Sequence, residues 1–132
     1  MRRSARHYLL FAASPLAAIV ACLLFVWWAG RPLSRVEVTG DSMLPTLAPG
    51  DRLLVLRDGR VRAGDVVAVA DPRLPARTMV KRVATTGPLG VVVVGDNAAA
   101  STDSRVLGRV AARSIRGRAV YRYFPDSRRG RL

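Results

Sequence analysis

The longest apolar run of the chain lies near its N-terminus, over residues 8–29, and only Ser14 and Pro15 interrupt it. About 20 apolar residues are enough for a helix to cross the hydrocarbon core of a bilayer. Trp27 and Trp28 lie at the end of the run, where aromatic residues gather at membrane interfaces. A proline about two turns into such a helix kinks it without preventing it. The pattern therefore predicts one N-terminal transmembrane helix over residues 8–29.

Charges on either side of this predicted anchor indicate its orientation. More arginines precede the run than follow it: Arg2, Arg3 and Arg6 come before, Arg31 and Arg35 after. The positive-inside rule then places residues 1–7 in the cytoplasm and the rest of the chain outside the plasma membrane. A cleaved signal peptide is the alternative, although its apolar core would be unusually long and no small-residue cleavage site directly follows the run.

Beyond a short linker at residues 30–35, apolar residues occur in brief runs separated by Gly, Pro and Asp, a pattern typical of β-strands. Short strands at this spacing predict an all-β domain over residues 36–125, built as a small, partly closed barrel or sandwich of antiparallel strands. Residues 126–132 would follow as a basic, solvated C-terminal tail. The predicted strands cover residues 36–38, 53–57, 66–70, 78–84, 91–94 and 115–124, with turns at Asp58-Gly59 and 87–90, a loop over 71–76 and a helical turn at 98–100.

The chain is strongly basic, with a formal net charge of +13 at pH 7 and 22 Lys and Arg residues. Such a charge would suit nucleic acid, but the arginines are spread along the sequence, match no nucleic-acid-binding motif and lie mostly in the predicted exported part. Attraction to anionic lipid head groups explains the charge without a nucleic-acid partner. We therefore expect contact with the lipid bilayer and no binding to nucleic acid.

Cys22 and His7 are the only residues of their kinds, and they lie within or before the predicted membrane helix. A single cysteine excludes an intrachain disulfide, and the exported part has no thiol cluster that could bind a metal ion. We expect neither a metal ion nor another cofactor.

All but one of the basic residues are arginines, and the exception is Lys81. A lysine amine can lose its proton when it is buried, whereas a guanidinium stays charged. Period-two alternation in the predicted strand puts Lys81 on one face with Met79 and Val83. Val80 and Arg82 lie on the other face. To serve as a base, a lysine needs its pKa lowered from about 10.4 to about 7–8, which burial can achieve. An exposed strand lysine is the alternative.

A second candidate group is Ser42, in the segment Gly40-Asp41-Ser42-Met43-Leu44-Pro45-Thr46. Gly and Asp permit a tight turn before the serine, and Pro stiffens the segment after it. Because the exported part contains no histidine, Lys81 is the only obvious base that could activate a serine nucleophile there. Met43 and Leu44 could line a substrate pocket, contact the membrane interface or pack in the core.

Three further blocks follow the Ser42 segment in order: Gly64-Asp65-Val66-Val67, Lys81-Arg82-Val83 and Gly95-Asp96-Asn97-x-x-x-Ser101-x-Asp103-Ser104-Arg105. Together the four blocks resemble the type I signal peptidases, which are membrane-anchored serine endopeptidases with a Ser/Lys catalytic dyad. The resemblance covers about residues 36–110.

This resemblance implies roles for five residues. Ser42 corresponds to the nucleophile, Lys81 to the general base, and Ser101 to a serine that helps to orient the lysine amine. Asp103 and Arg105 correspond to a supporting pair that we interpret as structural. The resemblance also implies an all-β catalytic fold, pockets for small residues, and exported precursor proteins with N-terminal leader peptides as substrates.

The chain departs from the family pattern at two places. Some members provide an oxyanion-hole hydroxyl two residues before the nucleophile, where this chain has Gly40. The short stretch between Lys81 and Gly95 leaves no room for the large accessory β-domain of some bacterial members, so the chain resembles a compact form.

Three other functions remain open at this point. The ending Tyr121-Arg122-Tyr123-Phe124-Pro125 is similar to that of actinobacterial proteases that process the precursor of nickel superoxide dismutase, which would make this a dedicated maturation protease. Self-cleaving repressor-type proteases share the Ser/Lys chemistry, but they are cytosolic, and the predicted anchor argues against them. The chain could also be a catalytically inactive, membrane-tethered binding module.

Overall fold

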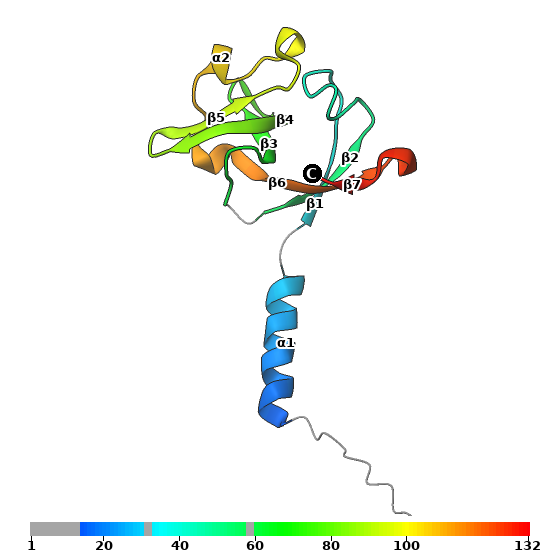
Figure 1. Ribbon diagram of the computed structural model, residues 1–132. Helices are drawn as coiled ribbons and strands as arrows, with labels where there is room; N and C mark the ends of the chain where they lie inside the picture. Colours follow the sequence, from blue (N-terminus) through cyan, green and yellow to red (C-terminus); the bar gives the residue numbers. More distant parts are fainter. Residues whose placement is uncertain (1–13, 31–32, 58–59) are drawn as a thin grey trace, which may run out of the picture. The chain divides into compact units, whose positions relative to one another are not determined.

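The computed structural model describes residues 14–30, 33–57 and 60–132 (Figure 1). The chain forms two compact units, Met1–Gly30 and Arg31–Leu132. The first carries a single described helix, and the second carries the strands and the candidate site.

Helix α1 comprises Pro15–Ala29. Proline suits the first position of a helix because its missing N–H would have no intrahelical partner there. Ser14 caps the helix, its hydroxyl accepting the N–H of Ala17 at 3.3 Å. The proline therefore starts the described helix, and the part of the predicted span over residues 8–13 lies outside the described residues. Among the residues that the structure describes, no helix is long and apolar enough to cross a membrane.

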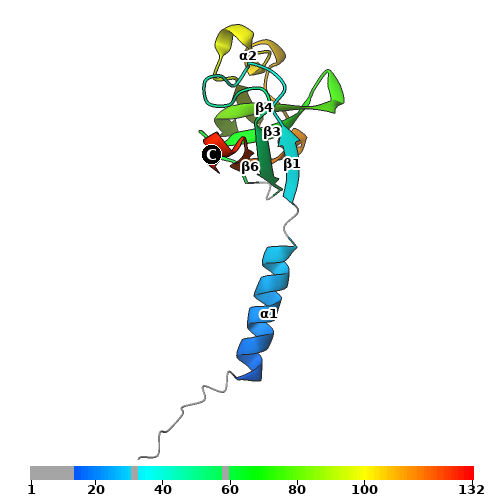
Figure 2. The same cartoon turned by 90° about the vertical axis from the view of Figure 1, so that its right-hand side faces the viewer.

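Within the described residues of the second unit, seven strands form one sheet in which every pair is antiparallel (Figures 1 and 2). The order is β1-β2-β6-β3-β4-β5, with β7 on β6, and the edge strands β1 and β5 do not pair with each other. The predicted all-β, antiparallel class is confirmed, whereas the sheet is open and not a closed barrel. The strands are β1 (Leu33–Glu37), β2 (Arg52–Leu56), β3 (Val66–Asp71), β4 (Leu74–Gly87), β5 (Gly90–Val94), β6 (Ile115–Phe124) and β7 (Gly130–Arg131).

Strand β6 joins the two halves of this sheet. At Arg118 it pairs with Leu56 of β2 on one edge and with Val67 of β3 on the other. Beyond Arg118, where the pairing of β6 with β3 ends, β7 pairs with β6 at Tyr121 and Arg122. Gly117 permits this close approach, because a Cβ there would lie 2.6 Å from the carbonyl oxygen of Leu56. One half of the sheet therefore holds β1, β2 and β7, and the other holds β3, β4 and β5.

Successive residues of β3 alternate between two buried hydrophobic clusters. The alternation predicted for β4 is confirmed, because Val80 belongs to the first cluster while Met79 and Val83 belong to the second. The first contains Val38, Met43, Leu47, Leu53, Val55, Val66, Ala68, Val80 and Ala119, and the second contains Val67, Val69, Met79, Val83, Val91, Val93 and Val110.

The loop predicted over residues 71–76 is wrong, because β4 already begins at Leu74. The Asp71 carboxylate accepts the backbone N–H of Arg73 at 2.9 Å, which reverses the chain within two residues. The predicted turn at Asp58-Gly59 lies outside the described residues.

Strand β4 contains a bulge near its start. Ala70 lies opposite Thr78, but Asp71, the next residue of β3, lies opposite Leu74, so residues 75–77 have no partner in β3. The proline of this segment has no N–H to give to the ladder and is tolerated in a bulge. Bulges redirect side chains next to binding sites, and this one lies shortly before Lys81.

The C-terminal residues 126–132 are mostly exposed, as expected of a solvated tail, but they are ordered. After a short 3₁₀ turn they form β7, and Arg128 makes an ion pair with Asp51. Arg122 of β6 pairs with the same carboxylate at 3.2 Å and donates to the carbonyl oxygen of Thr46 at 3.0 Å. Because Asp51 is fully buried, its charge requires such partners, and the chain end packs where Arg128 can supply one.

Candidate active site

Ser42 lies in the loop between β1 and β2, which folds as a compact turn. The carbonyl oxygen of Asp41 accepts the N–H of Leu44 at 3.1 Å, and that of Met43 accepts the N–H of Leu47 at 2.9 Å. Met43 and Leu47 are fully buried and fix the loop to the first hydrophobic cluster. Ser42 itself is half-buried at the surface of this turn.

Met43 does not line the cavity described below. Its side chain is fully buried because it closes the core beneath the turn. This is the core-packing alternative that the sequence left open. Leu44 is half-buried, and it is not among the residues that line the cavity described below.

Lys81 lies in the middle of β4 and is 3% exposed, so the alternative of an exposed strand lysine is excluded. Burial, the largest effect, lowers the pKa of its amine from the ordinary value of 10.5. The negative charges of Asp103 and Asp71 raise this pKa, while the positive charges of Arg105 and Arg77 lower it. The net direction favours the neutral amine, which is the form that a general base requires.

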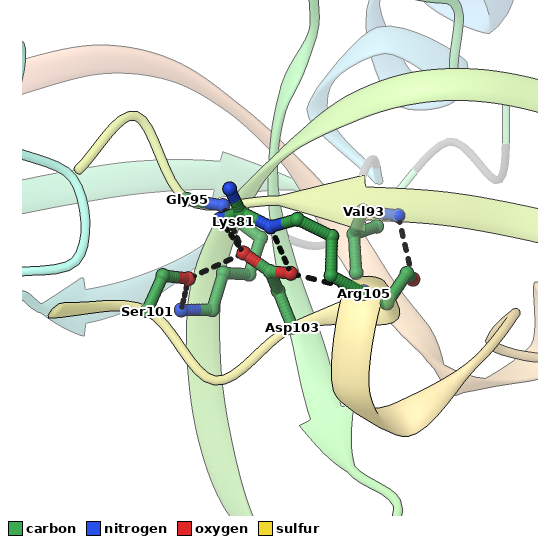
Figure 3. Close-up of polar contacts among 7 residues, drawn as sticks. Lys81, Val93, Gly95, Ser101, Asp103 and Arg105 are labelled. Carbon is green, nitrogen blue, oxygen red and sulfur yellow. Dashed lines mark hydrogen bonds and ion pairs between the residues drawn. The ribbon is translucent and has the colours of Figure 1, made fainter. Parts of the chain in front are cut away.

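A chain of hydrogen bonds holds the Lys81 amine (Figure 3). Its Nζ donates to Ser101 Oγ at 2.9 Å, and Ser101 Oγ donates to Asp103 Oδ2 at 2.6 Å. A hydroxyl has one hydrogen, and Ser101 gives it to the carboxylate, so its oxygen is left to accept from the lysine. This arrangement uses an N–H of Lys81 and leaves the lone pair of a neutral amine free for another proton.

Asp103 is fully buried and held as an anion (Figure 3). Arg105 donates to it through Nε at 2.9 Å and Nη2 at 2.6 Å, and the backbone N–H of Gly95 donates at 2.8 Å. Asp103 also caps the short helix α2 (Ser104–Leu107). The Arg105 guanidinium, followed by Ser101 and Gly95, holds the pKa of Asp103 well below its usual range. The carboxylate that fixes Ser101 therefore stays charged at neutral pH.

The block Gly95-Asp96-Asn97 connects the Ser42 loop to this network. Asn97 donates its backbone N–H to the carbonyl oxygen of Ser42 at 2.9 Å and its side-chain amide to that of Asp41 at 3.2 Å. A Cβ at Gly95 would lie 2.5 Å from the Ser42 carbonyl oxygen and 2.3 Å from Ser101 Oγ. Asp96 pairs with Arg82 at 2.7 Å, which fixes the block to β4.

Ser42 and Lys81 line the same cavity, which has a volume of about 160 Å³. Within the described residues no hydrogen bond joins the two side chains directly, and the amine donates to Ser101 instead. Hydrogen bonds between catalytic groups often form only with substrate bound. One wall consists of residues 37–42, and the facing wall consists of Arg73, residues 77–81, Ala100 and Thr102.

Sequence reasoning missed several residues of this cavity. Arg77 could have been found, because the alternation that places Met79 beside Lys81 extends back to position 77 on the same face. No sequence signal marked Glu37, Thr39 or Thr102. The role of Gly95 was also missed, although its block was recognised, because the close packing involves segments far apart in sequence.

The described part of the chain contains no group of three or more His, Cys, Asp and Glu side chains placed to ligate a metal ion. The cavity is lined by the hydroxyl of Ser42 and the buried amine of Lys81, while the hydroxyl of Ser101 and the carboxylate of Asp103 hold that amine from outside the lining. A hydroxyl and an amine with a lowered pKa in one cavity are the groups that nucleophilic catalysis by serine uses.

Comparison with known proteins agrees with this chemistry. A family model described as signal peptidase, peptidase S26, matches residues 10–92 and 88–124. The mitochondrial ATP-independent inner membrane protease subunit 1a of Arabidopsis thaliana is 37% identical over 127 residues, covering 76% of each chain. A probable signal peptidase I-1 of Synechocystis sp. is 28% identical over 165 residues, covering 89% of this chain and 83% of the relative. The chain therefore belongs to the signal peptidase, peptidase S26, family and is a serine endopeptidase of the signal peptidase I type.

Proposed function

We propose that this protein removes leader peptides from exported precursor proteins at a membrane, with Ser42 as nucleophile and Lys81 as general base. The observation that carries the proposal is the shared cavity, in which a half-buried serine faces the strand that holds a buried lysine with a lowered pKa. The names of the two relatives, an inner membrane protease subunit and a probable signal peptidase, support the substrate class and the membrane location.

In the proposed reaction, the neutral amine of Lys81 takes the proton of Ser42 Oγ while the oxygen attacks the scissile carbonyl carbon. The tetrahedral intermediate collapses as the ammonium returns the proton to the leaving amine, which departs with the mature chain. Lys81 then deprotonates a water molecule, whose oxygen attacks the acyl-enzyme ester. Collapse of this second intermediate returns the proton to Ser42 and releases the leader with a free carboxylate.

The developing oxyanion needs hydrogen-bond donors that are already in position. The donor that we propose is the backbone N–H of Ser42. Asn97 holds this N–H in place, because it donates to the carbonyl oxygen of Asp41, in the same peptide unit, and to that of Ser42, in the next unit. Gly40 contributes no side chain. Ser101, Asp103 and Arg105 act as positioning residues, since they hold the amine and do not line the space above Ser42.

A leader peptide would lie extended between the two walls of the cavity. Both walls are extended or turn segments, and a peptide that adds beside such segments is bound through its backbone while alternate side chains enter pockets. We propose that the precursor approaches from the membrane side, anchored like the enzyme itself.

We also propose that residues 8–29 anchor the protein, with residues 1–7 in the cytoplasm and the catalytic unit on the extracytoplasmic face. In α1 the exposed side chains are almost all apolar, including Leu16, Ile19, Leu23 and Phe25. A helix that is apolar all round needs an apolar environment. The positive charge of the chain would add attraction to anionic lipid head groups.

Membrane vesicles of known orientation would test cleavage and topology together. A precursor with an Ala-x-Ala site is added outside sealed vesicles that carry the full chain, and mass spectrometry identifies the new N-terminus. We expect prompt cleavage by right-side-out vesicles, and cleavage by inside-out vesicles only after detergent opens them. Prompt cleavage by sealed inside-out vesicles would contradict the topology, and the absence of cleavage even in detergent would contradict the protease function.

Replacing Gly95 with alanine should impair catalysis without touching either catalytic group. The new methyl must displace the carbonyl oxygen of Ser42 or the hydroxyl of Ser101, and a shift of about 1 Å can cost about 100-fold in rate. We expect kcat to fall by about 10–100-fold and the free energy of unfolding by about 1–3 kcal/mol. Gly130→Ala is the matched control, because nothing lies within 4 Å of a Cβ there. Equal kcat for Gly95→Ala and Gly130→Ala would contradict this role for Gly95.

A further inference from the structure

The lining of the cavity includes charged residues that the proposed reaction does not use. Arg73 and Arg77 line the cavity on one wall and Glu37 lines the other. Arg77 is the last residue of the β4 bulge at residues 75–77, directly before the pairing with β3 resumes at Thr78.

These charges do not cancel. The Asp71 carboxylate is almost fully buried and accepts two hydrogen bonds from the Arg73 guanidinium, from Nη2 at 3.0 Å and from Nε at 3.2 Å. It also lies 3.9 Å from Nη1 of Arg77. Glu37 is already paired with Arg52 at 3.3 Å. Two cavity arginines therefore share one carboxylate.

A third arginine adds to this excess. Arg116 donates through Nη1 to the Thr78 hydroxyl at 2.6 Å and through Nη2 to the carbonyl oxygen of Pro75. Both partners are neutral, and no acid among the described residues pairs with Arg116, which lies beside Thr78 of the cavity lining. The cluster of Arg73, Arg77 and Arg116 thus carries three positive charges against the single carboxylate of Asp71.

Arg77 is the member of this cluster that can accept a ligand. Its side chain is 62% exposed, and among the described residues its only contact with an acid is the 3.9 Å approach to Asp71, which is longer than a hydrogen bond. Arg73, by contrast, already donates two guanidinium hydrogen bonds to that carboxylate. A guanidinium with free donors in a fixed fork matches the two oxygens of a carboxylate.

We propose that this arginine cluster is a substrate subsite that binds an acidic side chain of the precursor through Arg77. The inference rests on the proposed function, since it assumes a peptide lying along the cavity from Ser42. Arg77 precedes Lys81 by four positions on β4, which corresponds to about 13 Å at 3.3 Å per residue. An extended peptide covers the same length with about four residues, so the acidic residue lies about four positions from the scissile bond.

Paired peptide substrates test this subsite. The two peptides of a pair share one Ala-x-Ala cleavage site. They differ at one position, two to six residues from the scissile bond, where one peptide has Asp and the other Asn, or one has Glu and the other Gln. We expect the wild-type enzyme to prefer the acidic member by about 10-fold in kcat/KM at about four positions, mainly through KM, because charge-assisted hydrogen bonds at exposed sites contribute modestly. Added salt should reduce the preference.

Variants separate Arg77 from the general basic charge of the protein. Arg77→Met should lower the acidic-to-neutral ratio to about one, and Arg77→Glu should invert it in favour of a peptide with Lys at that position. Arg109→Met is the matched control, because it removes the same charge from an exposed arginine outside the cavity. An effect of the Arg77 substitution on the pKa of Lys81 changes the cleavage of both peptides alike, because both meet the same enzyme. The acidic-to-neutral ratio of kcat/KM is therefore unaffected by it.

The outcomes distinguish the subsite from the function on which it depends. Cleavage of neutral and acidic peptides at equal rates would overturn the subsite and leave the protease function intact. A ratio lowered equally by Arg109→Met would overturn it as well, in favour of net charge. Arg77-dependent binding to phosphatidylglycerol vesicles without any peptide preference would overturn it and assign the cluster to lipid. No cleavage of either peptide would instead overturn the proposed function.

Discussion

Ser42→Ala is expected to lower kcat for precursor cleavage by about 10⁴-fold to 10⁶-fold, which is the range for loss of a serine nucleophile. Alanine keeps the backbone N–H that we assign to the oxyanion and removes only the attacking oxygen. Ser42 is half-buried and its backbone is held through Asn97, so the loop should keep its shape. The residual rate reports what binding and the oxyanion donor contribute alone.

The measurement is single-turnover cleavage of a precursor with an Ala-x-Ala site by the detergent-solubilised full chain. Ser34→Ala is the matched control, because Ser34 is a half-buried serine on β1 that does not line the cavity. Thermal unfolding of both variants checks that the fold is intact. If Ser42→Ala cleaved the precursor as fast as Ser34→Ala, Ser42 could not be the nucleophile.

Lys81→Arg should cost about 10²-fold to 10⁴-fold in kcat/KM, as expected for loss of a general base. Arginine keeps the positive charge and the donors toward Ser101, but it cannot give up its proton in a protein. Lys81→Met keeps the length of the side chain and removes the amine altogether. Both variants should lose a similar amount, because in both the base is missing.

The pH dependence of kcat/KM shows which protonation state of Lys81 is active. The neutral amine is the active form, so kcat/KM of the wild type should rise as pH passes upward through the pKa of Lys81. Burial lowers that pKa from 10.5, so the rising limb should lie below pH 10.5. Asp103, whose pKa is held well below its usual range, stays ionised throughout this range. Lys81→Arg should lack the rising limb, and a wild-type profile in that variant would rule out Lys81 as the base.

A double variant connects the two results. When two residues act in one step, removing both costs about as much as removing the more important one. Ser42→Ala combined with Lys81→Arg should therefore be no slower than Ser42→Ala alone. A further loss that multiplies the two single effects would show that Lys81 acts in some other step.

Local sequence patterns predicted much of the sheet. The period-two alternation around Lys81 gave the correct faces for Met79, Val80 and Val83, because a strand flanked by two apolar clusters repeats every second residue. The predicted strand over residues 115–124 coincides with β6, and the Gly87-Gly90 turn is present. These features depend on neighbours in the chain and need no tertiary information.

The features that the sequence left open or predicted wrongly share one cause, which is contact with distant segments. For Met43 the sequence left open a substrate pocket, the membrane interface and the core, and in the structure it packs in the core. The basic end is mostly exposed, but Arg128 holds it in place by pairing with the buried Asp51, which is far away in the sequence. The start of β4 looked like a loop because its proline and its bulge hid the pairing with β3.

The sequence by itself determined the chemical groups of the site, the order of its motifs and the face of the strand on which the single lysine lies. Only the tertiary structure decided that Lys81 is buried, that Ser101 and Asp103 hold its amine, and that the Ser42 loop is joined to them through Gly95. The physical reason is desolvation. A strand pattern fixes which way a side chain points, but the pKa of an amine depends on the segments that exclude water from it, and here those segments come from other parts of the chain.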